Sequence, residues 1–345
     1  MYSPNVTLAR GFPHSEIPGS KLICSSPRLI ALVIFVGVNL LLLYPLLRLT
    51  AYIIYLSTMV RKNEKCWDRE WYHPDEESCR MHDEGVEWAK AHADCMTEVK
   101  TVSEDGLELY GEYYDFGHDR AVIIIPGRTD NLVYSYYYAK PYSDNGYNVL
   151  CIDQRAHGKS EGKYVTTGFA ESRDAIKWIK LLEEDHGVKS VVIHGICIGS
   201  ACGLYTMLAE DAPESLSALV ADGMYCNFYE TYYLHMKDLG KPTFIMGMIE
   251  SEMKKKTGYG LRRGPADVID KYEKPLLMLH GTGDIYSLPS RTNEMFDKCP
   301  SENKKLVWFE DGRHSKLRIV YHERYDGAIA DFLATLESHV SSSHS

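Results

Sequence analysis

The chain has 345 residues, of which 45% are hydrophobic and 25% charged, and its formal net charge at pH 7 is −10. This length allows one large α/β domain or two small ones. The acidic charge argues against nucleic-acid binding, because the most basic cluster, Lys254–Lys256, is typical of a solvated helix face. No metal or cofactor motif is evident, and the sequence gives no indication of oligomeric state.

The nine cysteines include no C-x-x-C pair, so we expect no zinc site. Cys66, Cys79 and Cys95 could form a disulfide if the domain lies in an oxidising compartment. Cys151 and Cys202 lie in apolar runs and are expected to be small core residues.

The first predicted element is a membrane-spanning helix from Leu29 to Leu47. This run carries no charge and is about long enough to cross a bilayer. The chain stays apolar to about residue 60. A removable signal peptide would have a shorter apolar region and a small-residue cleavage site, and neither is evident. We therefore expect a single-pass N-terminal anchor that follows a tail of residues 1–28.

The orientation of this helix is left open by its flanking charges. Arg10, Lys21 and Arg28 precede the run, whereas Arg48, Arg61, Lys62 and Lys65 follow it. The positive-inside rule needs an imbalance, and these charges nearly cancel. Asn5-Val6-Thr7 fits a glycosylation sequon. Trp67, Trp71 and Tyr72 are suited to the headgroup region.

Residues 61–97 are expected to form a connector and a helix, from Glu76 to Met96. An α/β domain at residues 98–338 and a tail at 339–345 follow. Two alternating runs flank a turn at Glu104-Asp105-Gly106, which predicts a hairpin. Later short apolar runs are typical of buried parallel strands, at 121–125, 148–152, 190–194, 218–221, 275–280 and 304–309. Helical stripes separate them, as in Ala175, Trp178, Ile179 and Leu182. The fold class is therefore α/β, with a mostly parallel sheet covered on both faces.

The sequence GICIG, residues 195–199, lies between a predicted strand and a predicted helix. This is the context of the nucleophile elbow, a sharp turn that small residues must flank. Gly195 and Gly199 are such residues, and Cys197 stands at the position of the nucleophile. The helix N-terminus beside Cys197 favours a thiolate.

A base and an orienting acid are expected at the ends of two later strands. Asp284 follows the run 275–280, and His314 follows the run 304–309. The order nucleophile, acid, histidine is that of α/β-hydrolases. The sequence therefore predicts a triad of Cys197, Asp284 and His314.

An oxyanion hole is expected where the run 121–125 ends in Pro126-Gly127-Arg128. The glycine allows close approach of a substrate to the backbone. The N–H groups of Arg128 and Ile198 are the candidate donors, and each such donor lowers a barrier by roughly 3 kcal/mol.

From about Glu98 to Leu333 the chain resembles bacterial α/β-hydrolases, especially the membrane-anchored group. The similarity lies in SEDGLELYGEY, DQRAHGKSEG, VIHGICIGSACG, HGTGDIYSLP and FEDGRHSK. It implies the triad and the oxyanion donors named above, with a structural role for the loop from Asp153 to Gly162. The chain departs from the family pattern at Cys197, where serine is usual, and at Pro126, where the family loop opens with His-Gly. In having a cysteine at this position the chain also resembles dienelactone hydrolases and polyester synthases, but the rest of the sequence shows no wider match to either.

Each predicted role has rivals. Ser200 is a conceivable nucleophile but falls one turn into the helix, and Asp311 is the main alternative acid. His280, His194 and His157 are the alternatives to His314 as base.

Residues 223–274 are predicted to form a small helical lid. Its tyrosines, and those after the oxyanion loop, could line a pocket for an apolar acyl group or pack the lid onto the body. These residues are Tyr134, Tyr136, Tyr137, Tyr138, Tyr225, Tyr229, Tyr232 and Tyr233.

The leading hypothesis is thus a membrane-anchored hydrolase that cleaves an ester, thioester or lactone-like bond of a small-molecule substrate through an acyl-enzyme. An acyltransferase with the same triad, or a non-catalytic binding protein on this fold, are the alternatives. Sulfur favours the first alternative, because a thioester intermediate also reacts readily with amines and thiols.

Overall fold

A computed structural model describes residues 27–61 and 75–342, with side chains up to residue 337. The sequon at Asn5, Cys66, and the interface aromatics Trp67, Trp71 and Tyr72 lie outside the described residues. The chain divides into two units, with the boundary between Leu49 and Thr50, and each is described by itself.

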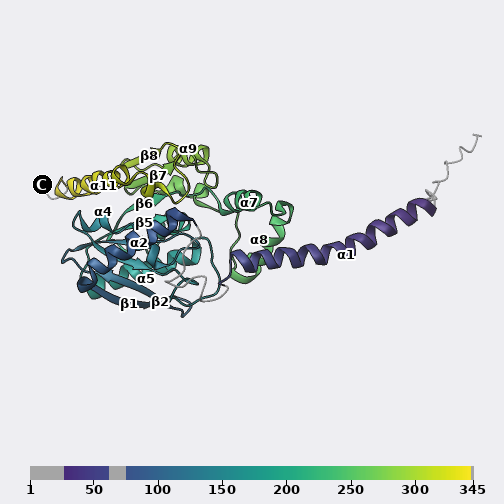
Figure 1. Ribbon diagram of the computed structural model, residues 1–345, viewed down its shortest axis with the longest axis horizontal. Coiled ribbons are helices and arrows are strands. Elements are labelled where there is room, and N and C mark those ends of the chain that lie inside the picture. The colour runs from purple at the N-terminus through teal and green to yellow at the C-terminus, as the bar shows by residue number, and fades with distance from the viewer. Residues whose placement is uncertain (1–26, 62–74, 343–345) are drawn as a thin grey trace, which may run out of the picture. The chain divides into compact units, whose positions relative to one another are not determined.

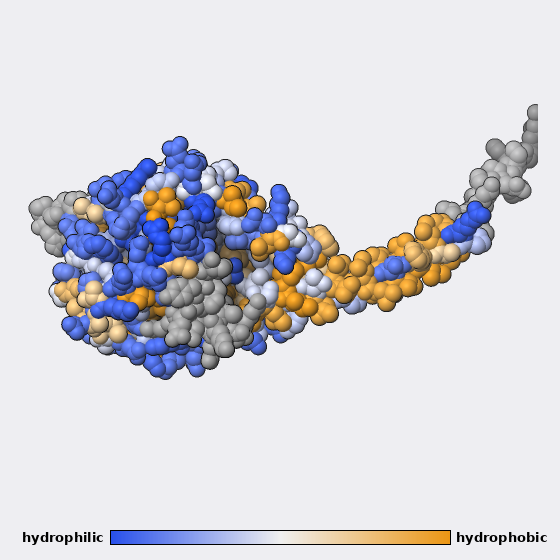
Figure 2. All heavy atoms as spheres, viewed as in Figure 1, coloured by the Kyte–Doolittle hydropathy of each residue, from blue (hydrophilic) through white to orange (hydrophobic). Residues whose placement is uncertain are grey.

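The boundary falls within α1, a helix of 32 residues from Pro27 to Thr58. It is longer than the predicted span. The residues of its first part are almost all exposed, and Figure 2 shows apolar side chains along its surface. By length and composition α1 could cross a membrane.

The second unit is built on an eight-stranded sheet in the order β1-β2-β4-β3-β5-β6-β7-β8 (Figure 1). β1 pairs antiparallel with β2, and β2 with β4, whereas the remaining neighbours are parallel. The strands are β1 (Met96–Val102), β2 (Glu108–Tyr114), β3 (Arg120–Ile125), β4 (Asn148–Ile152), β5 (Ser190–Ile196), β6 (Leu216–Asp222), β7 (Leu276–Gly281) and β8 (Lys304–Phe309). The mostly parallel sheet predicted from the strand runs is confirmed.

Helices pack on both faces of the sheet because the central strands are apolar on both sides. Successive strand residues point to opposite faces. Accordingly, Ile193 of β5 lies against Gly203 of α6, whereas the His194 imidazole bonds to Tyr325 of α11. The longer helices around the sheet are α2 (Glu76–Ala91), α5 (Phe169–His186), α6 (Ile198–Met207), α9 (Pro289–Lys298) and α11 (His322–Ser342), and the short ones are α3 (Leu132–Tyr136), α4 (Lys140–Ser143) and α10 (Leu317–Val320).

Helix α2 ends earlier than the predicted helix, which ran to Met96. The N–H of His92 bonds back to Ala89 at the helix end, and a 3₁₀ turn at Ala93–Cys95 leads into β1. Met96 is therefore the first strand residue, because it pairs with Tyr114 of β2.

The segment between β6 and β7 holds the elements of the proposed lid. These are α7 (Phe228–Asp238), α8 (Met246–Thr257) and the 3₁₀ turns η3 (Thr243–Ile245), η4 (Pro265–Asp267) and η5 (Ile269–Lys271). Asn227 caps the start of α7, because its side chain accepts a hydrogen bond from the N–H of Glu230.

The cysteines and tyrosines fall mostly in the core. Cys151 and Cys202 are buried as expected, and Cys95 is a free thiol. All four tyrosines after the oxyanion loop are buried, as are two of the four lid tyrosines, Tyr225 and Tyr232. Packing therefore accounts for most of this aromatic set.

Candidate active site

Cys197 occupies the turn between β5 and α6, with φ of 54° and ψ of −108°. Such a conformation is costly for a residue with a side chain and marks functional turns. A Cβ added to Gly195 would overlap the backbone of Gly199, and a Cβ at Gly199 would overlap the carbonyl of Ile125. The turn therefore requires the two flanking glycines, as predicted. Cys197 itself is 9% exposed.

The predicted acid and base lie in direct contact. Nδ1 of His314 donates a hydrogen bond to Oδ2 of Asp284, at 2.7 Å. The second carboxylate oxygen, Oδ1, accepts the N–H groups of Tyr286 and Ser287, at 2.8 Å each. Burial alone would raise the pKa of Asp284, but the His314 charge and these bonds hold that pKa below its ordinary value. Asp284 is thus built to stay ionised and to fix the imidazole.

His314 lies close to the thiol of Cys197. Burial lowers the pKa of His314, but the Asp284 carboxylate and the neighbouring Cys197 outweigh it, so the pKa stands well above its ordinary value. Nε2 of His314 is buried and has no hydrogen-bond partner of good geometry among the described residues. Contacts between nucleophile and base are often loose before substrate binds. Nε2 is therefore the ring nitrogen left for proton exchange with Cys197.

The loop after β3 lies beside the nucleophile. A Cβ added to Gly127 would stand 3.9 Å from Cβ of Cys197. Within the described chain, the N–H groups of Arg128 and Ile198 donate no hydrogen bond to protein. Both expected oxyanion donors are consequently available to a ligand.

The loop from Asp153 to Gly162 holds this oxyanion loop in place. Nε2 of Gln154 donates to the carbonyl of Pro126 at 2.7 Å, and Nε2 of His157 lies 2.5 Å from the carbonyl of Arg128. Asp153 accepts the N–H of Leu132 at 2.7 Å. The structural role of the loop from Asp153 to Gly162 is thus to position the oxyanion loop.

Two of the rival residues, Ser200 and His280, bond to backbone carbonyls, and a third, Asp311, is exposed. The Ser200 hydroxyl is fully buried and donates to the carbonyls of Gly195 and Asp222, at 2.6 and 3.0 Å. Nε2 of His280 bonds to the carbonyl of Ser287 at 2.7 Å. Asp311 is exposed and has a positive φ of 54°.

Asp222 is a further carboxyl group beside the site that the sequence analysis did not identify. It ends β6, is fully buried and accepts a hydrogen bond from the Tyr325 hydroxyl at 2.7 Å. Its carbonyl accepts the N–H of Cys197 at 2.8 Å. Burial raises the pKa of Asp222 to about 7, although Tyr325 and His314 oppose the shift. The signal that could have identified Asp222 is its position as an acidic residue directly after the predicted strand 218–221.

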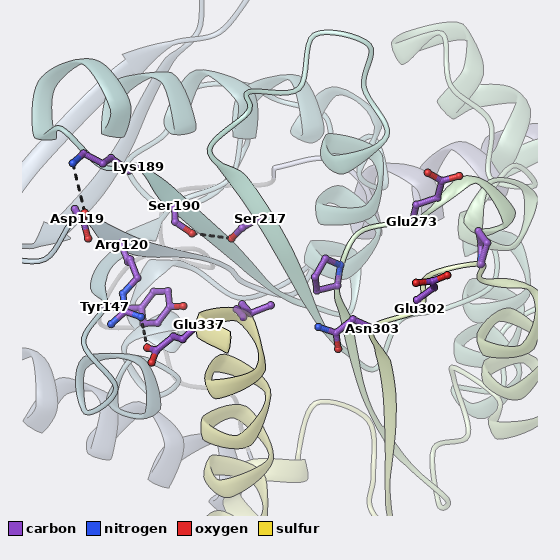
Figure 3. A pocket seen from close by; sticks show the side chains of 13 residues that line it. Asp119, Arg120, Tyr147, Lys189, Ser190, Ser217, Glu273, Glu302, Asn303 and Glu337 are labelled. Carbon is purple, nitrogen blue, oxygen red and sulfur yellow. Dashed lines mark hydrogen bonds and ion pairs between the residues drawn. The ribbon is translucent and has the colours of Figure 1, made fainter. Parts of the chain in front are cut away.

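A separate cavity of about 1000 Å³ lies at the amino-terminal edge of the strands, away from the triad. Three pairs of its polar side chains interact (Figure 3): Arg120 with Glu337, Lys189 with Asp119 and Ser190 with Ser217. It contains no pairing of a nucleophile with a base. In open α/β sheets ligands bind at the carboxyl ends of the strands, which is the edge where Cys197, Asp284 and His314 lie.

Comparison with known proteins identifies the family of this fold. Residues 120–237 match the α/β-hydrolase fold family model. The chain is 30% identical over 234 residues to the uncharacterized protein YqkD of Bacillus subtilis, covering 66% of this chain and 76% of that protein. The chain belongs to the α/β-hydrolase family.

Two further similarities come from a membrane protein and a solved esterase. The chain is 23% identical to the uncharacterized membrane protein YNL320W of Saccharomyces cerevisiae, over 56% of this chain and 62% of that protein. The Pyrococcus furiosus esterase Pf2001 superposes with a TM-score of 0.62 at 25% identity, covering 72% of this chain and 93% of the esterase.

Proposed function

We propose that this α/β-hydrolase cleaves an ester, thioester or lactone-like acyl bond through a Cys197–His314–Asp284 triad. One observation carries the proposal. His314, which is hydrogen-bonded to Asp284 at 2.7 Å, lies next to Cys197, and Cys197 occupies a strained turn. The similarity of the chain to a solved esterase supports the same class of reaction.

In the first half-reaction, the Cys197 sulfur attacks the acyl carbon and a C–S bond forms. The carbonyl electrons move to oxygen, where the N–H groups of Arg128 and Ile198 bind the oxyanion. When the carbonyl reforms, the bond to the leaving group breaks. His314, which holds the proton taken from the thiol, transfers it from Nε2 to the leaving group.

In the second half-reaction, water attacks the thioester and His314 accepts its proton. Collapse of the tetrahedral intermediate breaks the C–S bond and releases the acid, and the proton returns to sulfur. Asp284 keeps Nδ1 protonated throughout, so that Nε2 is the reactive nitrogen.

The hydrolase unit is proposed to be held at a membrane by α1. Its apolar residues are enough to span a bilayer, and similarity to a yeast membrane protein supports the assignment.

Acyl transfer is a second outcome of the same chemistry, and the nucleophilic sulfur favours it. A thioester reacts with amines and thiols more readily than an oxygen ester does. Product analysis with an added amine acceptor separates transfer from hydrolysis.

The test is intact mass analysis of the full chain in detergent after mixing with a short activated ester. We expect an acyl adduct in the wild type and in Cys202→Ala, whose thiol is buried in the same helix region, but none in Cys197→Ala. An adduct that persists in Cys197→Ala would refute the assignment. Absence of both adduct and turnover in the wild type would favour a binding protein instead.

A further inference from the structure

The segment joining α7 and α8 exposes two large apolar side chains. From Thr50 onward, Phe244 and Leu239 are the most exposed large apolar residues described, at 75% and 66%. Single exposed apolar residues are ordinary. Leu239 and Phe244 lie in the same short connection between two helices, and we call them together the patch Leu239–Phe244. Exposed apolar residues that are close in the chain are a candidate contact for a partner.

Basic residues flank this patch. Lys237 and Lys241 are both exposed, whereas the nearby Asp238 carboxylate accepts a hydrogen bond from the Tyr286 hydroxyl at 2.7 Å. Lysines beside exposed aromatic and aliphatic groups are typical of segments at a lipid surface, because the ammonium reaches the headgroups while the apolar groups enter the boundary of the acyl chains.

The helix that carries the patch is bonded to the end of α1. The Tyr232 hydroxyl of α7 hydrogen-bonds to the Thr58 hydroxyl, and the Arg128 guanidinium donates to the Thr58 carbonyl at 2.7 Å. Ala51 and Tyr55 of α1 are fully buried. The nine residues Thr50–Thr58 follow Leu49, where the first unit ends. As helix they span about 14 Å, so the chain keeps α7 near any membrane that α1 enters.

The inner side of α7 packs on the catalytic loop. His235 stacks on Tyr286 with ring centroids 3.6 Å apart, and Tyr286 meets His314 edge to face at 6.0 Å. One short helix thus connects the exposed patch to the proposed base.

We propose that the patch Leu239–Phe244 contacts the surface of the bilayer that α1 enters, and that the site takes acyl esters of membrane amphiphiles. The proposal rests on the proposed function for its substrate. A substrate held at the bilayer surface would reach Cys197 along α7 without passing through bulk water.

The contact is tested by photo-cross-linking. The full chain, with p-benzoylphenylalanine replacing Phe244, is placed in vesicles of phosphatidylcholine and phosphatidylglycerol and irradiated. The matched control carries the same group at Val102 of β1, which is 58% exposed. Lipid adducts at residue 244 and none at 102 are expected. Equal labelling at both positions, no adduct at 244, or a protein–protein adduct there would overturn the proposal.

Activity supplies the second arm. The double substitution Leu239→Glu and Phe244→Glu should lower kcat/KM by about tenfold on an ester embedded in vesicles, because two apolar side chains leave the interface. Turnover of a short soluble ester should not change. Wild-type failure on the soluble ester would count against the proposed function. Wild-type turnover of that ester with an unchanged vesicle rate in the double variant would count against the membrane contact alone.

Discussion

Gly223 offers a sharp test of the catalytic histidine because it lies directly behind the imidazole. Its φ is +60°, and a Cβ added there would stand 3.3 Å from Cε1 and Nδ1 of His314. Gly223→Ala therefore has two effects: strain in the left-handed backbone, of about 1 kcal/mol, and a push of a few tenths of an ångström on the imidazole.

The two effects are separated by a matched control, Gly187→Ala. Gly187 has φ of +65° at the end of α5, and a Cβ there meets nothing within 4 Å. Both variants should lose similar stability. A 1 Å misplacement of a catalytic group costs about 100-fold, so a smaller shift should lower kcat of Gly223→Ala by about fivefold.

The assay measures kcat on a short activated ester, together with the melting temperature, for the full chain in detergent. Gly187→Ala should keep the wild-type kcat. If Gly223→Ala loses stability as the control does but keeps full activity, then His314 is not the base, or its position does not limit the rate.

Three further variants probe the neighbouring groups. Ser200→Ala should cost about 1 kcal/mol of stability, through its lost hydrogen bond to Gly195, yet keep the acyl adduct; loss of the adduct would revive Ser200 as the nucleophile. Asp284→Asn should lower kcat by about 100-fold and shift the pKa of His314 downward in the pH–rate profile; an unchanged profile would contradict the orienting role. Asp222 keeps a proton between about pH 4 and pH 7 that the unfolded chain releases, so wild-type stability should fall with rising pH in that range, by up to about 4 kcal/mol. Asp222→Asn should lack this slope in melting temperature against pH, and an identical slope would refute the buried proton.

The architecture could be predicted because strands that are buried on both faces consist of continuous runs of branched apolar residues, which are visible in the sequence. The elbow could be anticipated for a similar reason: its two glycines are required by local backbone crowding, which a short motif records. The positions of Asp284 and His314 follow from topology, since parallel strands bring their carboxyl ends to one edge.

Asp222 could not be assigned in this way. Its burial and its bond to Tyr325 depend on the packing of α11 against the sheet, across 103 residues of chain. The role of most of the tyrosines was equally hidden, since a side chain that fills the core and one that lines a pocket have the same composition. Both questions depend on contacts between distant elements, which periodicity does not encode.

Arg128 combines two long-range contacts with a proposed role in the site. Its guanidinium bonds to the Thr58 carbonyl, its own carbonyl faces His157, and its N–H is a proposed oxyanion donor. The end of α1 is therefore part of the support of the site as well as the continuation of the proposed anchor. Cutting the chain after Thr58 to obtain a soluble domain would remove the buried Tyr55 and the acceptor of the Arg128 guanidinium together. A loss of activity in such a fragment would then report a displaced oxyanion loop, and would say nothing about whether Cys197 is a nucleophile.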